Sequence, residues 1–545
     1  MSATRQNAQL AEALLRPGPQ IDPDTEWWRG AMFYEVYVRS FFDSNGDGVG
    51  DLRGVCEKLD YIASLGVDGV WLSPFFTSPQ KDFGYDVSDF TTVDPSHGSL
   101  DDFIRLLEQA HAKGLKVLAD FVPCHTSDQH EWFLESRADP KGPKGDWYIW
   151  ADAAADGSPP NNWLSSFGGP AWTWEPRRAQ YYYHPFLTCQ PALNLRNPDV
   201  LGAMIENMEF WLDLGVDGFR LDAIQCLCWD PDLRSNPARG RDGADIPFGG
   251  GPNNPFTRQL HLFDRDLPAA LDIIATMREA VDRYDPPRAL IGELADVDSA
   301  RISVKYTAGE DRLHAVYDFS LINSGHDWHD WLRVLRERSE HIGPGWLMSC
   351  LTNHDTERAV TALTGCKDDP ALCQSAAKAL LFLQATLRGG GIIFQGEELG
   401  LPQPEMEFED LRDPWGINLW PDFSGRDGVR TVMPWKSRAR NLGFTRADEP
   451  WIAPGRGHEA LSVDKQEKDG NSVLNFLRDL LAWRRDNPVL RFGDEDVKPP
   501  SAEPIISLRR YDDEREIRCI VNFGPTPRVV PVDGGKAIFP RRNKP

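Results

Sequence analysis

Short apolar runs recur along the chain, and each ends in polar or charged residues before a helical or loop pattern begins. Apolar runs of about four to eight residues are typical of strands that are buried on both faces. Helical or long loop segments separate the runs, and residues 100–114 show apolar positions at helical spacing. Eight such runs occur, at 31–38, 67–74, 115–122, 216–223, 288–294, 314–320, 345–355 and 390–399. This alternation predicts a parallel sheet, and eight units predict a closed (β/α)8 TIM barrel.

Two segments are too long for the short loops of such a barrel. Residues 125–195 follow the third predicted strand and are rich in Trp, Tyr, Pro and Gly. We expect them to form an inserted subdomain over the barrel mouth, because long unstructured loops are uncommon in compact domains. Residues 400–470 form a second Pro- and Trp-rich excursion after the eighth strand. The predicted catalytic barrel therefore comprises residues 26–124 and 196–487.

The end of the chain has a different pattern. A helix is expected at about 471–487, and short alternating strands follow at 504–511, 515–523 and 527–532. We interpret residues 488–545 as a small C-terminal antiparallel β domain. Residues 1–25 lack a sustained apolar segment, so we expect a leader-free N-terminal arm.

Composition restricts the classes of function. The net charge is −24, from 59 basic and 83 acidic residues, which disfavours nucleic acid and anionic membranes as partners. No run of apolar residues is long enough for a transmembrane helix. The nine cysteines lack the paired spacing of a zinc site or a disulfide framework, so we expect free thiols and a cytoplasmic protein. The 19 tryptophans suit the faces of sugars.

Polar residues gather at the ends of the predicted strands. In a barrel the C-terminal ends of the strands form the mouth, where catalytic groups collect. A single carboxylate at a strand end is often only a helix cap, but four such endings on one face favour an active site. The residues in these positions are Asp120, His125, Arg220, Asp222, Glu293, His354 and Asp355.

The types of these residues suit glycoside cleavage. Arg220 and Asp222 lie two apart on a strand and share a face, so we expect the guanidinium to lower the pKa of Asp222 and keep it ionised as a nucleophile. Burial and neighbouring carboxylates should raise the pKa of Glu293, as a general acid requires. Asp355 supplies a third carboxylate. The same residues would also suit a divalent metal in a hydrolase, and the residue types alone leave that alternative open.

The chain resembles family 13 of the glycoside hydrolases, the α-amylase family, and within it the α-glucosidase and oligo-1,6-glucosidase group. The resemblance rests on ordered motifs and runs from about residue 26 into the C-terminal β domain. The four main motifs are DFVPCHTS (120–127), GFRLDAIQ (218–225), IGEL (291–294) and LTNHDTER (351–358). Three further stretches support them, DGVWLSPFFTSP (68–79), FGYDVSDF (83–90) and GRDGVRTVMPW (425–435).

The resemblance implies specific roles for residues of this chain. Asp222 would be the nucleophile, Glu293 the acid/base and Asp355 the stabiliser of the transition state. Residues implied to hold the sugar in subsite −1, the site of the glucose to be cleaved, are Asp82, Tyr85, His125, Arg220, His354 and Arg426. Phe167 and Phe186 match aromatic positions near that sugar, and Asp120 matches a partner of these groups. Ala192 departs from the family, whose members often carry an acidic residue there.

The resemblance also implies one structural divalent cation, Ca²⁺ or Mg²⁺. Its ligands would lie in the loop after the first strand, where the spacing is that of a calcium loop. An EF-hand would have a glutamate where this chain has Gly54. An acidic turn capped by its own amides is the alternative. The implied ligands are the side chains of Asp43, Asn45, Asp47 and Asp51 and the carbonyl oxygen of Val49.

The implied activity is exo-acting, retaining α-glucosidase activity on small α-glucosides. Ala223, after the nucleophile, matches a position where a small residue goes with α-1,4 linkages and valine with α-1,6. Glucosyl transfer to sugars or alcohols is expected beside hydrolysis, in a monomer or a homodimer. The alternatives are an oligo-1,6-glucosidase, an isomaltulose or trehalose synthase, and a non-catalytic transporter-associated relative.

Overall fold

The computed structural model describes residues 26–240, 253–295, 299–324, 327–341, 345–366, 369–498, 503–524, 526–530 and 539. The predicted N-terminal arm, residues 1–25, lies outside the described residues.

Eight parallel strands close into a barrel, as predicted, in the order β1-β13-β12-β11-β10-β9-β5-β2. Each of the eight predicted runs contains one of these strands, although the strands are shorter than the runs. Their bounds are β1 Met32–Val36, β2 Gly69–Leu72, β5 Lys116–Phe121, β9 Gly218–Leu221, β10 Ala289–Leu294, β11 Ala315–Asp318, β12 Leu347–Cys350 and β13 Gly390–Phe394.

The barrel strands are apolar on both faces because side chains alternate between the barrel interior and the surrounding helices. In β1, Phe33 belongs to a core cluster that also contains Trp71 and Tyr317 from other strands. Tyr34 and Val36 belong to the larger cluster outside the barrel. The interior is therefore a packed core, and the polar residues at the strand ends lie above it.

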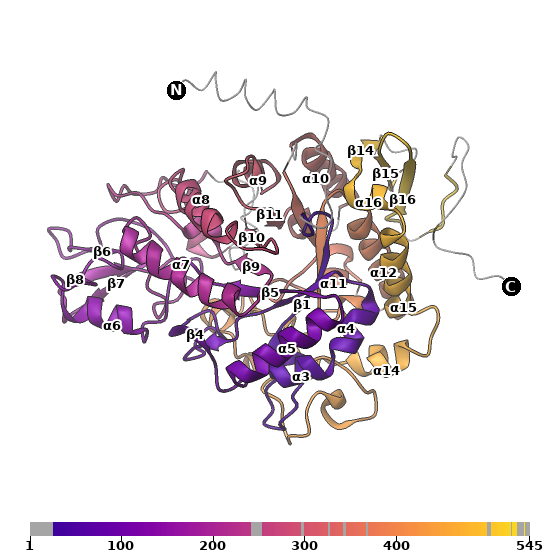
Figure 1. Cartoon of the computed structure of the whole chain (residues 1–545), viewed down its shortest axis with the longest axis horizontal. Helices are drawn as coiled ribbons and strands as arrows, with labels where there is room; N and C mark the ends of the chain where they lie inside the picture. The colour runs from indigo at the N-terminus through magenta and orange to yellow at the C-terminus, as the bar shows by residue number, and fades with distance from the viewer. Residues whose placement is uncertain are drawn as a thin grey trace.

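Helices surround the barrel (Figure 1). The helix predicted at residues 100–114 is α5, which begins after its N-cap residue Ser99, and Ser99 forms a capping box with Asp102 in the first turn. The helix predicted at 471–487 is α15. The main helices are α3 Leu52–Glu57, α4 Leu59–Leu65, α5 Leu100–Ala112, α7 Pro198–Asp213, α8 Ala270–Val281, α9 Ser299–Thr307, α10 Trp328–His341, α11 Ala359–Thr364, α12 Pro370–Thr386 and α15 Val473–Arg485.

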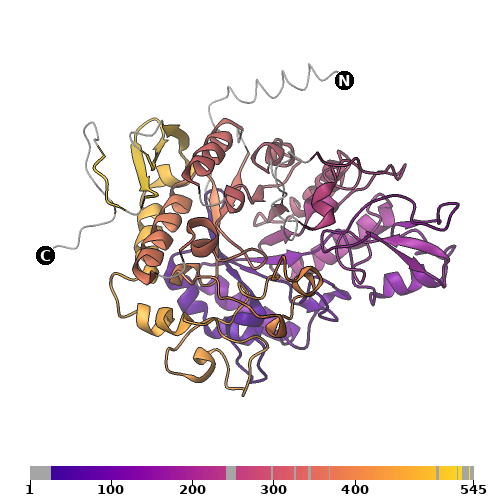
Figure 2. The same ribbon diagram turned by 180° about the vertical axis from the view of Figure 1, so that it is seen from behind.

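The segment between β5 and β9 folds into its own small sheet. Strands β6 (Trp150–Ala151), β8 (Gln180–Tyr183) and β7 (Trp172–Glu175) pair in that order beside helix α6 (Glu131–Ala138). This sheet projects from one end of the molecule in both ribbon views (Figures 1 and 2). A two-stranded sheet of β3 (Phe76–Thr77) and β4 (Asp89–Val93) lies in an earlier loop.

Little regular structure forms in the excursion after β13. It contains the short helices α13 (Pro414–Leu419) and α14 (Val463–Gln466). After α15, helix α16 (Pro488–Phe492) leads into the C-terminal sheet.

The C-terminal sheet is antiparallel, as predicted, and lies far from β6–β8 in Figure 1. Its order is β14 (Asp494–Lys498), β15 (Ile505–Tyr511) and β16 (Glu516–Asn522). The prediction of a strand at 527–532 is wrong for residues 527–530, which form no strand. Residues 531–532 lie outside the described residues. Strand β14 was missed because its sequence, DEDVK, is almost wholly charged.

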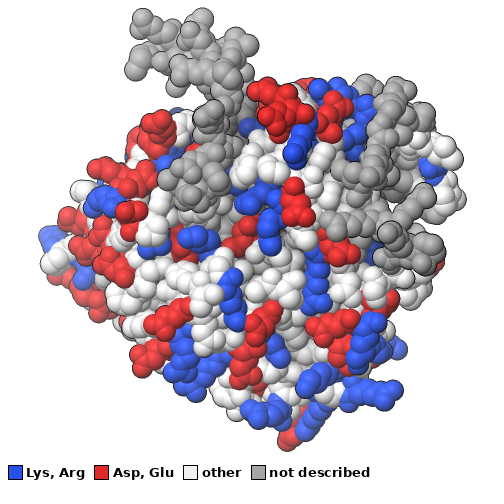
Figure 3. All heavy atoms as spheres, turned by 45° about the vertical axis from the view of Figure 1, so that its right-hand side comes forward, with Lys and Arg blue, Asp and Glu red and all other residues white. Residues whose placement is uncertain are grey.

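The charge is distributed without a strong bias on the face that Figure 3 shows, where acidic and basic side chains are interspersed. Within the described part of the chain, no helix has both the length and the apolar character needed to cross a bilayer.

Candidate active site

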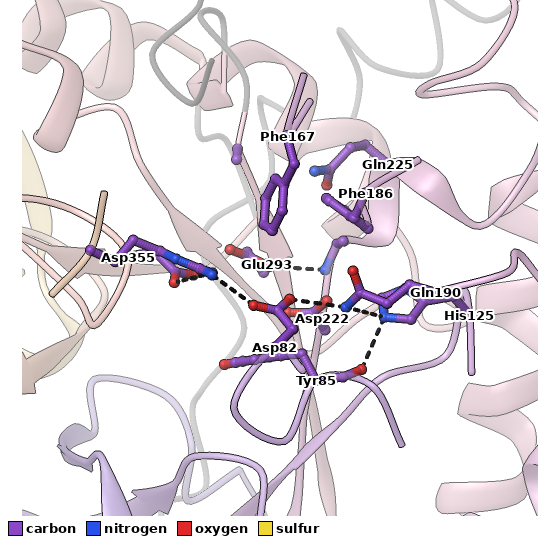
Figure 4. Close-up of a pocket in the computed structure, with 13 residues that line it drawn as sticks. Asp82, Tyr85, His125, Phe167, Phe186, Gln190, Asp222, Gln225, Glu293 and Asp355 are labelled. Atoms are coloured by element: carbon purple, nitrogen blue, oxygen red, sulfur yellow. Dashed lines mark hydrogen bonds and ion pairs between the residues drawn. The ribbon is translucent and has the colours of Figure 1, made fainter. Parts of the chain in front are cut away.

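The predicted strand-end residues meet at one cavity of about 440 Å³ at the barrel mouth (Figure 4). It is lined by Asp82, Tyr85, His125, Phe167, Phe186, Gln190, Asp222, Ala223, Gln225, Glu293, Ala295, Asp355 and Arg426. The lining therefore includes all three predicted catalytic carboxyl groups and six of the eight predicted sugar-binding residues. The other two, Arg220 and His354, lie behind the wall and contact lining residues.

Arg220 is the charge centre beneath the cavity. Its Nη1 atom lies 2.6 Å from Oδ1 of Asp222 and 2.9 Å from Oδ1 of Asp120. Its Nη2 atom lies 2.9 Å from Oε2 of Glu293. The guanidinium also lies over the ring of Trp71, with the ring centroid 4.8 Å away. One buried cation therefore orients three carboxyl groups, and Asp120 has the supporting place that the resemblance implied.

The prediction for the pKa of Asp222 is wrong in sign. Burial raises the pKa to about 7, and the charges of Asp120 and Asp355 act in the same direction. Arg220 lowers the pKa, as expected, but its charge is shared among three carboxyl groups and does not outweigh burial.

The pKa of Glu293 is raised, as predicted. Burial raises it to about 8, and Asp222 and Asp355 add to the effect. The backbone N–H of Ala223 donates to Oε2 of Glu293 at 2.9 Å. Ala223 has a left-handed backbone, with φ of 45°, in the turn that points this N–H at Glu293.

Asp355 is the carboxyl group that is most clearly ionised. Burial raises its pKa, but His354, Arg426 and Arg430 together hold it well below the usual range. Nη2 of Arg430 donates to Oδ1 of Asp355 at 2.6 Å, and Nη1 of Arg426 donates to the same atom at 3.2 Å. Arg430 was not predicted, although it lies four residues after Arg426 in the same motif.

Asp82 and His125 line the cavity and are joined through Gln190. Oδ1 of Asp82 accepts from Nη2 of Arg426 at 2.6 Å, and Oδ2 accepts from Nε2 of Gln190 at 2.9 Å. Nε2 of Gln190 also lies 3.2 Å from Nε2 of His125. Gln190 was missed as a site residue. The available signal was its position two residues before Ala192, where the sequence departs from the family pattern.

Aromatic rings connect the inserted segment to the excursion after β13. Phe167 stacks on Trp415 of α13, with ring centroids 4.6 Å apart and planes 10° apart. The guanidinium of Arg426 lies 5.0 Å from the centroid of Phe167. Phe186 contacts His125 edge to face at 5.5 Å. The two contacts of Phe167 therefore wall the cavity with residues more than 200 positions apart in the sequence.

The acidic loop after β1 binds its own amides. The structure describes no group of three or more carboxylate, histidine or cysteine side chains arranged around a potential metal position. Oδ1 of Asp43 accepts from the N–H of Gly46 at 2.6 Å, and Oδ1 of Asp47 accepts from that of Val49 at 2.8 Å. Asn45 accepts from Asp47, and Asp51 caps α3 through Gly54. These are the contacts expected of a self-capped turn.

Comparison with known proteins identifies the class. Residues 35–493 match the family described as "Alpha amylase, catalytic domain". The chain is 43% identical over 528 residues to a probable α-glucosidase of Rhizobium meliloti (strain 1021), covering 94% of each protein. It is 34% identical to an oligo-1,6-glucosidase of Parageobacillus thermoglucosidasius, covering 91% of this chain and 90% of that protein.

Solved structures agree. The α-glucosyl transfer enzyme XgtA superposes with a TM-score of 0.89 at 46% identity, with 94% of each chain covered. The trehalulose synthase MutB from Pseudomonas mesoacidophila MX-45 superposes with a TM-score of 0.82 at 32% identity, with 92% of each chain covered.

The chain belongs to the α-amylase family, and it is therefore a glycoside hydrolase with a (β/α)8 barrel. Within the family it falls in the group that contains the α-glucosidases and oligo-1,6-glucosidases, as the sequence motifs indicated.

Proposed function

We propose that this protein is a retaining, exo-acting α-glucosidase that uses Asp222 as nucleophile and Glu293 as acid/base. The observation that carries the proposal is that these two carboxyl groups are paired with Nη1 and Nη2 of one guanidinium, that of Arg220. Retaining glycosidases need two carboxyl groups about 5–5.5 Å apart, and a shared guanidinium favours such a short separation.

The reaction proceeds in two displacements. Oδ of Asp222 bonds to the anomeric carbon while the bond to the leaving oxygen breaks, and Glu293 transfers its proton to that oxygen. Water or an alcohol then gives its proton to Glu293 and attacks the anomeric carbon, which releases Asp222. Asp355, which its arginine partners hold as a carboxylate, stabilises positive charge on the sugar ring in both steps.

The walls of the cavity support binding of one terminal glucose. The Phe167–Trp415 stack closes one side, and the Asp82–Arg426 ion pair of 2.6 Å provides polar groups for hydroxyls. Asp82, Tyr85, His125, Arg426 and the two phenylalanines surround this glucose in subsite −1. An open groove for starch would require this wall to be absent.

We infer a preference for α-1,4 linkages from the small side chain of Ala223, which lines the cavity beside Glu293. Glucosyl transfer to alcohol or sugar acceptors is a second proposed activity. It is supported by the likeness to the α-glucosyl transfer enzyme XgtA, which covers 94% of this chain.

We infer one structural divalent cation in the acidic loop. The donors there, Asp43, Asn45, Asp47 and Asp51 with the Val49 carbonyl, are all oxygens, which Ca²⁺ and Mg²⁺ prefer. Each carboxylate has about four lone-pair sites, so the amide contacts leave acceptor capacity. The loop is not part of the lining of the cavity, so its cation would serve stability.

Retention is the first test. Hydrolysis of maltose, followed by proton NMR from the first seconds, should release α-glucose before mutarotation mixes the anomers. Asp222→Asn should lower kcat by several orders of magnitude because the covalent route is lost. Initial release of β-glucose would contradict the mechanism.

The pH dependence of kcat/KM should be bell-shaped. Activity needs Asp222 without its proton and Glu293 with it, so it should fall as pH drops below about 7 and as it rises above about 8. The two apparent pKa values of this profile belong to the coupled pair of Asp222 and Glu293 and not to either residue alone. With an aryl glucoside whose leaving group needs no protonation, Glu293→Gln should lose the alkaline limb. A flat profile between pH 5 and 10 would rule out this pair.

The pocket and the linkage preference are tested by kcat/KM for maltose, isomaltose and soluble starch. Maltose should be cleaved best, and starch poorly. Ala223→Val should reduce the maltose-to-isomaltose ratio. The ratio is the readout, because valine at φ of 45° is strained and will lower stability as well. If the wild type prefers isomaltose, the proposed α-1,4 preference is wrong. If it cleaves starch rapidly within the chain, the proposed pocket for one terminal glucose is wrong.

Removal of the cation should act on stability. A chelator should lower Tm, and added Ca²⁺ or Mg²⁺ should restore it, since a ligand of the folded state stabilises by linkage. Asp47→Asn should reduce the response. An unchanged Tm with chelator would favour the self-capped turn, and immediate loss of turnover with the fold intact would make the metal catalytic.

A further inference from the structure

Glu35 is a buried carboxyl group that the proposed mechanism does not use. It is the one charged residue of β1, and it lies on the same strand face as Phe33, which points into the barrel interior. Its register partners are Trp71 in β2 and Phe394 in β13. Its exposed fraction is zero. A buried carboxyl group is costly unless it is paired, so its contacts indicate why it is there.

The partner of Glu35 is His354. Oε1 of Glu35 lies 2.5 Å from Nδ1 of His354. Among the described residues, Oε2 of Glu35 has no hydrogen-bond partner, so His354 is the polar partner of this side chain. The other ring nitrogen, Nε2, lies 2.6 Å from the hydroxyl of Tyr85 and 3.3 Å from Oδ2 of Asp355. His354 therefore lies between Glu35 and two residues of the cavity lining.

The hydrogen bonds around Asp120 determine which nitrogen of His354 carries a proton. Asp120 accepts from Nη1 of Arg220 through both oxygens, at 2.9 and 3.1 Å, and from Nε1 of Trp71 at 3.2 Å. A carboxylate with these donors has no proton to give, so the hydroxyl of Tyr85 donates to it at 3.0 Å. That hydroxyl has one hydrogen. It must therefore accept from His354, and Nε2 of His354 carries a proton.

The proton at the other end of the imidazole lies on Glu35. Burial raises the pKa of Glu35 well above its usual value and lowers that of His354 well below. A neutral carboxyl that donates to Nδ1 of a neutral imidazole satisfies both groups. It also leaves Nε2 protonated, as the Tyr85 contact requires.

Stacking fixes the plane of the His354 ring but not its edge-to-edge orientation. The ring is nearly parallel to those of Tyr37 and Tyr85, with centroids 5.6 and 5.4 Å away and planes within 11° and 9°. Parallel neighbouring rings still allow the imidazole to turn over about its Cβ–Cγ bond. The contact with Glu35 selects one orientation.

We propose that Glu35 is a positioning residue that holds His354 with a protonated Nε2 facing Tyr85 and Asp355, two residues of the cavity lining. This inference rests on the proposed roles of His354 and Asp355. Without Glu35, Nδ1 could keep the proton, and Nε2 would then present a lone pair to the Asp355 carboxylate 3.3 Å away. The hydroxyl of Tyr85 would have to turn its hydrogen from Asp120 to Nε2, so Asp120 would lose that hydrogen bond.

Glutamine and methionine at position 35 separate this role from packing. Both match the length of glutamate, but only the glutamine amide can donate to Nδ1 and reproduce the neutral pair. Glu35→Gln should keep kcat on an aryl α-glucoside within about threefold. Glu35→Met should lower kcat about 10–100-fold, the effect typical of a lost orienting hydrogen bond. Equal activity of the two variants, whether both high or both low, would overturn the proposal.

A double-mutant cycle asks whether Glu35 acts through His354. If it does, adding Glu35→Met to His354→Gln should cost little further activity, because the group that it positions is already gone. Losses that multiply would mean that Glu35 acts by another route, which contradicts the proposal. Tm is measured for each variant. If Glu35→Met does not fold, Glu35→Asp takes its place, since its shorter side chain cannot reach Nδ1 and should behave like the methionine variant.

A second readout needs no substrate. In protein labelled with ¹⁵N-histidine, the signal of His354, assigned by its absence from His354→Gln, should report a protonated Nε2 in wild type and in Glu35→Gln. In Glu35→Met the proton should move or be shared between the two nitrogens. An unchanged tautomer in Glu35→Met would overturn the proposal even if the enzyme had another substrate, whereas failure of the wild type to cleave α-glucosides would overturn only the proposed function.

Discussion

A single buried guanidinium facing three carboxyl groups determines how this active site is organised. Arg220 contacts Asp120, Asp222 and Glu293, and one positive charge in a medium of low dielectric cannot offset three negative ones. At least one carboxyl group must therefore hold a proton near neutral pH. Glycoside cleavage needs such an asymmetry, because one carboxyl group attacks while the other donates.

Strand register places these groups together. Asp120 in β5 and Ile291 in β10 are the register partners of Arg220 in β9, and Glu293 follows Ile291 by two residues on the same face. A slip of one residue in either pairing would turn the carboxyl group toward the surrounding helices. The apolar alternation that fixes the register therefore also fixes the chemistry, and the packed barrel interior beneath it prevents the groups from relaxing apart.

Periodicity was sufficient to predict the eight barrel strands and two of the three strands of the C-terminal sheet, and the family resemblance supplied most of the cavity lining. Asp222, Glu293 and Asp355 could be found because strand ends in a barrel share one face, which is a local property of the chain. Strand β14 could not, since DEDVK has no apolar alternation and becomes a strand only by pairing with β15. The stack of Phe167 on Trp415 joins two irregular segments, for which periodicity gives no information.

Long-range packing also explains the errors in electrostatics. The spacing of Arg220 and Asp222 correctly indicated an ion pair, but the pKa of Asp222 depends on burial and on Asp120 and Asp355, which come from other strands and loops. Glu35 shows the same limit. A glutamate in an apolar strand is visible in the sequence, but its partner lies 319 residues away. The acidic loop remains a predicted cation site whose amide contacts are compatible with the alternative of a self-capped turn.

The central claim is that Asp222 forms a covalent bond to glucose during turnover. The most direct test is to react the protein with an activated 5-fluoro-α-glucosyl substrate, whose slow deglycosylation allows the intermediate to accumulate, and to map the product by peptide mass spectrometry. The account predicts one fluoroglucosyl group per chain, located on Asp222 and absent from Asp222→Asn. Turnover of α-glucosides with the label on another residue, or with no trapped intermediate, would contradict it.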